Sequence, residues 1–353
     1  MKTDFEKELE QVMTEKKEMP ATVRKSLDSA YASVRAQSKK KKSRFIWKRV
    51  TAAACTLLIT GVVLTNEHVI ASIHDFFTFG DKGIERAINE GFVQESASTA
   101  TDQQIAIALQ RHFSDANKIG LSFQLEFEDP TILDDVISVS MNFRLKNGDG
   151  EYIIEFIPDT KPLKGNGGYA SSLDHQNPLL DAKNGVVQYD VIMDSNKGEF
   201  PNLKDAVVEV EGIVGLLDHE GKDFINRDLP IIKIEGKWDL SVANQDSSKP
   251  MPIIEYAMDD PSSIIQVSSA KASPTSLNII FSVDKIFEDE SPFSHTMKIV
   301  DREGNEYLTN GYNETRKDNQ TIISANFEIT SYDNAEKLTF VIEGMGEVDL
   351  LRK

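Results

Sequence analysis

Sixteen consecutive residues without a charged side chain, residues 50–65, divide the chain into two parts of opposite charge. The 49 residues before this stretch carry 14 basic and 7 acidic side chains, whereas the residues after it carry 25 basic and 50 acidic ones. As a helix the stretch is about 24 Å long, and a bilayer core is about 30 Å thick. Apolar flanks at 45–47 and 69–73 supply the remaining length. We therefore expect one transmembrane helix with its flanks over residues 45–73, which crosses the membrane from Val50 to Leu64.

Two other interpretations of the uncharged stretch fit less well. A secretory signal peptide begins with a short basic region, whereas 49 residues precede this stretch. A buried core helix has a suitable length, but the lysine run at 39–42 beside an aromatic cluster is typical of a membrane flank. Because positive charge collects on the cytoplasmic side, the sequence predicts a single-pass protein of the cell membrane. Its N-terminus is cytoplasmic and its C-terminal domains are extracytoplasmic.

The cytoplasmic segment, residues 1–44, is predicted to form two short amphipathic helices that meet at Pro20. Apolar residues recur at helical spacing and give each helix one stripe. Helices of this size do not bury such stripes alone, so a soluble partner that accepts a helix in a groove is the favoured interpretation. The alternatives are a loosely paired hairpin and helices that rest on the anionic inner leaflet. The candidate partner-binding residues are Phe5, Leu9, Val12, Val23, Leu27, Tyr31 and Val34.

The acidic remainder of the chain is predicted to be mainly β. Apolar and polar residues alternate along many short segments, and clusters such as Asn147 to Gly150 mark the turns between them. A short helix is expected near Lys82 to Asn89, and an ambiguous segment at 103–113 favours a strand. The other predicted strands are 121–128, 136–145, 152–157, 186–193, 207–215, 231–242, 263–270, 277–284, 295–301, 321–329 and 338–344.

A stretch without periodicity, from Asn244 to Pro252, predicts a linker between two β domains. Frequent turns between short alternating strands are typical of β-sandwiches. The predicted fold class is mainly β, with short N-terminal helices, one transmembrane helix and two extracytoplasmic β-sandwich domains of immunoglobulin-like type. The predicted domains are 1–44, 45–73, 74–245 with a short helical connector, a linker at 246–252, and 253–353.

Composition and motifs argue against most catalytic classes. A net charge of −18 opposes direct binding of nucleic acid. The six histidines lack metal-ligand spacing, and Cys55, the only cysteine, falls within the predicted span. The sequence has no nucleophile elbow and no phosphate loop. We therefore predict that the protein is not an enzyme and has no catalytic, cofactor or metal site. Acidic clusters at 126–129, 134–135, 259–260 and 288–290 are interpreted as solvated loop charge, with calcium as the alternative.

Two local motifs carry a resemblance to a known family. GDKGIERAINEGFVQ, residues 80–94, follows the predicted span, and GKWDLSV, residues 236–242, closes the first predicted β domain. Together with the helical N-terminus, the lysine run and the single span, they make the chain resemble the membrane-anchored anti-sigma-factor-like proteins of Gram-positive bacteria. The resemblance covers nearly the whole chain in organisation. A zinc-containing subgroup carries an H-x3-C-x2-C motif, which is absent here because Cys55 is the only cysteine.

The resemblance implies a regulatory function. Such a protein sequesters an extracytoplasmic-function (ECF) sigma factor through its cytoplasmic helices and senses an envelope signal through its outer β domains. The alternative, from a different class, is a membrane-tethered envelope-binding or structural module with no regulatory role. The sequence itself identifies neither the sigma factor nor the external signal.

Overall fold

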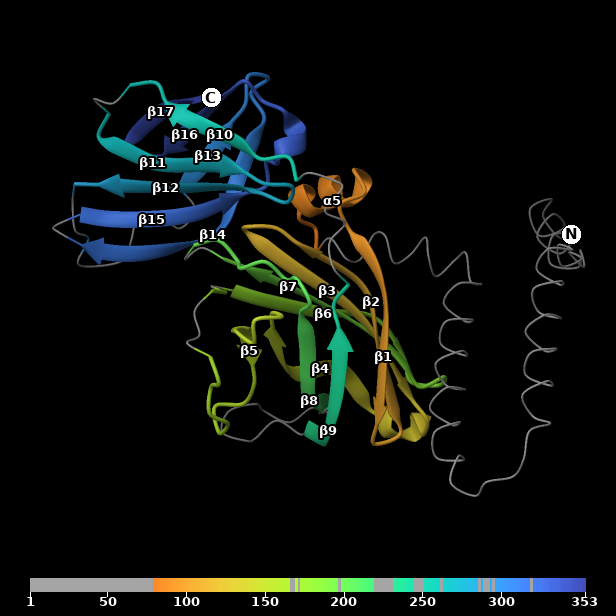
Figure 1. Cartoon of the computed structure of the whole chain (residues 1–353). Coiled ribbons are helices and arrows are strands. Elements are labelled where there is room, and N and C mark those ends of the chain that lie inside the picture. The colour runs from red at the N-terminus through yellow and green to blue at the C-terminus, as the bar shows by residue number, and fades with distance from the viewer. Residues whose placement is uncertain are drawn as a thin grey trace, which may run out of the picture. The chain divides into compact units, whose positions relative to one another are not determined.

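The computed structural model describes the chain from Phe79 onward. The described residues are 79–165, 169–170, 172–195, 198–218, 231–243, 251–260, 263–284, 287, 293, 296–317 and 320–353. They are mainly β, with seventeen strands and one α-helix, α5 (Lys82–Asn89) (Figure 1). No helix in this part of the chain is long and apolar enough to cross a membrane. The predicted helices of residues 1–44 and the predicted span at 45–73 lie outside the described residues.

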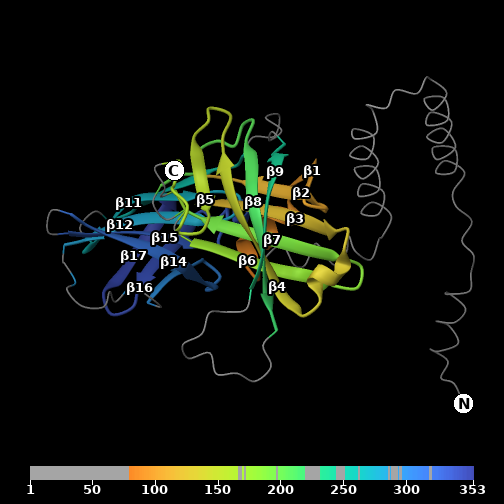
Figure 2. The same cartoon turned by 90° about the horizontal axis from the view of Figure 1, so that it is seen from below.

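Strands β1–β9 form two antiparallel sheets, which we call the first lobe. The five-stranded sheet has the order β1-β2-β3-β7-β6, and the four-stranded sheet has the order β5-β4-β8-β9. Figure 2 shows that the strands of the two sheets cross one another. The strand bounds are β1 (Gln94–Asp102), β2 (Ile105–Ser114), β3 (Lys118–Phe127), β4 (Val136–Lys146), β5 (Tyr152–Phe156), β6 (Ser172–Asp181), β7 (Val186–Asp194), β8 (Val207–Leu217) and β9 (Ile231–Ser241), with a short 3-10 helix at Pro130–Leu133.

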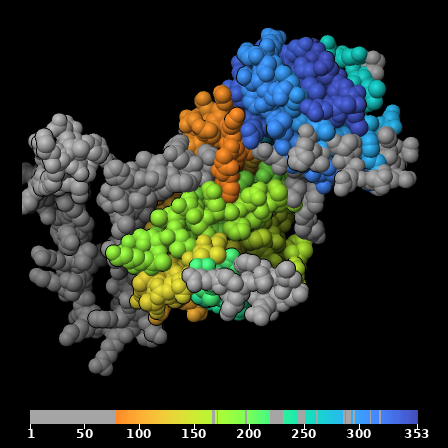
Figure 3. All heavy atoms as spheres, turned by 180° about the vertical axis from the view of Figure 1, so that it is seen from behind, coloured from red at the N-terminus to blue at the C-terminus, as the bar shows by residue number. Residues whose placement is uncertain are grey.

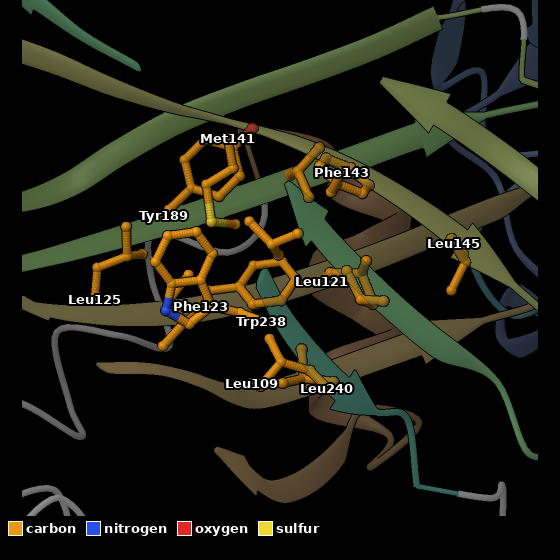
Figure 4. Close-up of a cluster of buried hydrophobic side chains, with 14 of the residues drawn as sticks. Leu109, Leu121, Phe123, Leu125, Met141, Phe143, Leu145, Tyr189, Trp238 and Leu240 are labelled. Atoms are coloured by element: carbon orange, nitrogen blue, oxygen red, sulfur yellow. The ribbon is translucent and has the colours of Figure 1, made fainter. Parts of the chain in front are cut away.

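Alternating apolar residues of both sheets meet in one core in the first lobe (Figure 4). Leu121, Phe123 and Leu125 point into it from β3, as the alternation of that segment predicts. Trp238 of β9 is fully buried there, and its indole N–H donates a 2.9 Å hydrogen bond to the carbonyl of Ile105 in β2. The Trp238 side chain therefore joins the two sheets both by apolar contact and by a hydrogen bond.

Replacement of Trp238 with phenylalanine is expected to lower the free energy of unfolding by about 1–2 kcal/mol, since it removes the hydrogen bond from the indole to the Ile105 carbonyl and part of the buried ring. Urea denaturation of the full chain, followed by circular dichroism, measures this loss. The exposed Lys237→Ala variant is the control and should change the free energy by less than about 0.5 kcal/mol. A Trp238→Phe variant as stable as the wild type would show that the hydrogen bond contributes nothing.

Strands β10–β17 form the second lobe, a sheet that closes on itself in the order β10-β11-β12-β15-β14-β13-β16-β17. Closure depends on β10, whose first residues pair with β11 and whose last residues pair with β17. A separate apolar core fills this lobe. The bounds are β10 (Ile254–Met258), β11 (Ile265–Ala272), β12 (Leu277–Val283), β13 (Met297–Val300), β14 (Glu306–Lys317), β15 (Gln320–Phe327), β16 (Lys337–Ile342) and β17 (Gly346–Arg352), with a 3-10 helix at Ser331–Asp333.

The mainly β prediction is confirmed, whereas the immunoglobulin-like sandwich is not. The eight strands of the second lobe are hydrogen-bonded in one closed order instead of two separate sheets. The physical reason is the long return of β17 to β10, a pairing between distant residues that alternation within each strand does not reveal. The first lobe has two sheets over one core, but the Ig-like type of this arrangement stays a prediction.

Candidate functional site

The helix α5 begins at an aspartate that both caps it and binds a buried lysine. Asp81 accepts hydrogen bonds from the backbone N–H groups of Gly83 and Ile84, at 2.8 and 3.0 Å. These are donors that a helix leaves unpaired at its first turn. The other carboxylate oxygen of Asp81 binds the ammonium group of Lys118 in β3. One side chain therefore fixes the start of α5 to the five-stranded sheet.

Lys118 is buried among carboxylates on the face of the sheet that α5 covers. Its side chain is 2% exposed, and its Nζ lies 3.5 Å from Oδ1 of Asp194, its neighbour in β7. Burial opposes the charged form, but the carboxylates of Asp194 and Asp81 outweigh this effect and raise the pKa of Lys118 above its usual value. Burial raises the pKa of Asp194. The group is an ion cluster in which each charge depends on its neighbours.

A turn of the first lobe meets a turn of the second lobe beside this cluster. Asp115, in the turn between β2 and β3, accepts from the backbone N–H groups of Asn117 and Lys118 with one oxygen. Its other oxygen accepts from the backbone N–H and the hydroxyl of Thr275, at 2.8 and 2.7 Å. Asn117 in turn donates to the backbone and side-chain oxygens of Ser276. Four hydrogen bonds thus end on one buried carboxylate, and two of them join segments about 160 residues apart.

The helix α5 also contacts the second lobe directly (Figure 3). Gly83 lies so close to the chain there that a Cβ atom on it would be 2.2 Å from the carbonyl oxygen of Thr275. Arg86 pairs with Asp333 at 3.1 Å. Tyr332 packs on the apolar cluster that Ile84 forms with other residues of α5 and of the five-stranded sheet. We call α5, the turn at 115–117 and the turn at 273–276 the junction, because the three segments hold both lobes together.

A buried histidine lies near the junction, in the wall of a cavity of about 200 Å³. His112 is 3% exposed and forms a hydrogen bond with the backbone of Ala243. Its Nδ1 atom is buried and has no hydrogen-bond partner among the described residues. Burial lowers the pKa of His112 below its ordinary value, so the ring is neutral near pH 7.

His112 predicts a loss of stability in mild acid. The unfolded chain binds a proton on this residue below its ordinary pKa of about 6.5, whereas the folded chain does so only at lower pH. The contribution of neutral His112 to the free energy of unfolding is therefore fully present above about pH 6.5. It decreases as the pH falls towards the pKa of His112 in the folded chain, by at most about 1.4 kcal/mol per pH unit. Urea denaturation at about pH 7 and about pH 5 should show a smaller acid loss in His112→Gln than in the wild type. An equal loss would contradict this role, since His175, whose pKa burial also lowers, is present in both proteins.

A second cavity, of about 250 Å³, borders the ion cluster. Its wall includes Lys118 and the carboxylates of Asp81, Asp174, Asp194 and Glu328. Within the described ranges, no group of three or more His, Cys, Asp or Glu side chains is arranged to hold a metal ion. The residues at 288–290 lie outside those ranges.

None of the partner-binding residues predicted from the sequence belongs to the junction. Phe5, Leu9, Val12, Val23, Leu27, Tyr31 and Val34 all lie outside the described residues. Local sequence patterns do not identify the junction residues as a site, although Asp81 before the predicted helix carries an N-cap signal. Lys118 carried no comparable signal, because a lysine beside an apolar strand is ordinarily solvated. The partners Asp115 and Thr275 are too far apart in the chain for local patterns to connect them.

Comparisons with known proteins give a family match over part of the chain. The profile of a family described as “Domain of unknown function (DUF4179)” matches residues 40–127. No curated protein matches the chain significantly. Among solved structures, one similar chain is described as “The crystal structure of the conserved domain protein from Bacillus anthracis”. It is 17% identical, with a TM-score of 0.42, over 71% of this chain and 77% of that one. The chain is thus similar to the DUF4179 family from its lysine run to the end of β3.

Proposed function

We propose that the protein is a single-pass membrane regulator whose outer lobes sense an envelope signal and whose cytoplasmic helices bind an ECF sigma factor. The observation that carries the proposal is that α5, the first described helix after the predicted span, is bound to both lobes at once. A change in the way the lobes meet therefore has a direct route to the segment that enters the membrane.

The extent of the family match supports this proposal. Residues 40–127 include part of the lysine run, the uncharged stretch, α5 and strands β1–β3. The matched segment thus joins the predicted membrane span to Asp81, Asp115 and Lys118 of the junction. This continuity is what a transmitter needs, since coupling between two sites requires an element whose state both sites bias.

The proposed mechanism has two states. In the resting state the junction is closed and the cytoplasmic stripes hold the sigma factor. An external event that favours a different arrangement of the lobes weakens the contacts of α5, and the altered position of the chain at the membrane releases the sigma factor. Two such states need differ by only a few kcal/mol for a ligand or a mechanical load to shift the balance between them.

Co-purification tests the cytoplasmic half of the proposal. The full chain in detergent should retain a co-expressed ECF sigma factor, and Leu27→Glu should weaken the complex roughly 30-fold, as expected for a central apolar contact. Ser26→Glu adds the same charge beside the stripe and is the matched control. If the wild type retains no sigma factor and deletion of residues 1–38 has no phenotype, the protein is instead a tethered envelope-binding or structural module.

A further inference from the structure

The cavity beside His112 has the properties of a small-molecule site. We propose that it binds an uncharged molecule with an apolar body and one hydrogen-bond donor. Segments of both lobes form its wall. Ser114 is the last residue of β2 and Asp115 follows it, while Ser273 and Pro274 belong to the turn after β11. A molecule in this cavity therefore contacts both lobes next to their shared hydrogen bonds.

Apolar side chains form a large part of the cavity wall. Phe200, Pro201 and Pro274 line it together with Met251 and Ile253. The last two are 40% and 55% exposed, which is high for large apolar side chains. Exposed apolar surface in the wall of a concave site favours an apolar occupant, because binding removes that surface from water.

The polar groups of the wall determine the rest of the chemistry. The carboxylate of Asp115 already accepts four hydrogen bonds, and Glu199 pairs with Lys271 at 3.0 Å. Because both carboxylates already have partners, they do not favour a cationic ligand. Among the buried side-chain atoms that the structure describes in this wall, the one without a hydrogen-bond partner is Nδ1 of His112, an acceptor in the neutral ring, because the other ring nitrogen carries the proton. A neutral donor such as a hydroxyl group satisfies it.

Contact between the donor and His112 requires a small movement. Nδ1 is enclosed in the structure, so the imidazole ring must turn towards the cavity when the molecule binds. A buried acceptor without a partner costs free energy, and this cost is recovered when the ligand supplies the missing hydrogen bond. The inference concerns the cavity alone and holds whether or not the chain binds a sigma factor.

Two isomeric probes, benzyl alcohol and anisole, separate the donor from the apolar body. The full chain in detergent, with ¹³C-labelled methionine methyl groups, reports binding through Met251 in the cavity wall, and the core residues Met141 and Met193 serve as internal references. Benzyl alcohol should shift the Met251 signal with a Kd on the order of 1 mM, as ligands of this size allow. Anisole, which lacks the donor, should bind about tenfold more weakly.

Three variants complete the test. In His112→Phe the preference for benzyl alcohol over anisole should be lost, and comparison of the two Kd ratios, wild type against variant, cancels the partition of the probes into detergent. Ile253→Lys places a charge at the cavity and should weaken both probes, whereas Ile264→Lys, at an isoleucine that is 71% exposed and outside the cavity, should not. Equal binding of the isomers to the wild type, no shift at Met251, or an equal effect of the two lysine variants would each overturn the proposal.

Discussion

Replacing Lys118 with methionine is expected to lower the free energy of unfolding by about 3–5 kcal/mol. The substitution keeps most of the volume of the side chain but removes the ammonium group that Asp81 and Asp194 share. Asp81 is buried and the Asp194 side chain is only 14% exposed, so loss of the nearby positive charge from this site is strongly destabilising. The first turn of α5 should be destabilised most, because the Asp81 side chain that binds Lys118 also caps this helix.

Urea denaturation of the full chain measures the effect of Lys118→Met, with Lys237→Met as the matched control. Lys237 pairs with Asp239 at 3.1 Å, but its side chain is 78% exposed, so its loss should cost less than about 1 kcal/mol. The double variant Lys118→Met with Asp194→Asn should recover part of the loss, since it removes one of the two negative charges that the ammonium group had balanced. Equal small losses at both lysines would show that the buried cluster contributes no more than a surface ion pair.

Replacing Gly83 with alanine is expected to lower the free energy of unfolding by about 2–3 kcal/mol, because the new methyl group overlaps the Thr275 carbonyl. Helix propensity alone predicts the opposite sign, a gain of up to about 1 kcal/mol when glycine becomes alanine. The sign of the measured change therefore separates the two effects. A loss means that the contact between α5 and the second lobe is present in solution.

The matched control for Gly83→Ala is Lys82→Ala, an exposed position in the same turn of α5. It should change stability by less than about 0.5 kcal/mol. Limited proteolysis then locates the damage in Gly83→Ala, since a displaced helix is cut near its own residues before either core opens. If Gly83→Ala raised the free energy of unfolding by the amount that helix propensity predicts, this would contradict the close packing of α5 against the second lobe.

Local patterns predicted the elements of this fold well where one face of a strand is buried. The segment at 121–128 alternates apolar and polar residues, and β3 includes all of it except Glu128. The helix expected near Lys82 to Asn89 matches α5. Strand β1 was missed because its sequence, QESASTATD, has almost no apolar residue. Its polar side chains bind another strand instead, since Asp102 and Ser98 accept hydrogen bonds from the backbone of β9.

The arrangement of the elements was not predictable in the same way. Closure of the second lobe depends on β17 returning to β10, and the junction depends on Asp115 meeting Thr275. Each of these pairs joins residues far apart in the chain, and periodicity within a short window carries no information about such partners. The cytoplasmic stripe residues, which the sequence favours as a binding site, stay a prediction that the sigma-factor experiment tests.

Hydrogen exchange in α5 tests the central claim, that the second lobe holds the helix which follows the predicted membrane span. Tyr332→Ala removes a contact with the apolar cluster of α5 from the second lobe, and Tyr312→Ala removes a tyrosine that packs on the core of that lobe instead. In the full chain, Tyr332→Ala should speed exchange of the α5 amides by about tenfold or more, whereas Tyr312→Ala should leave them unchanged. Unchanged exchange in Tyr332→Ala would contradict the claim that α5 is coupled to the second lobe.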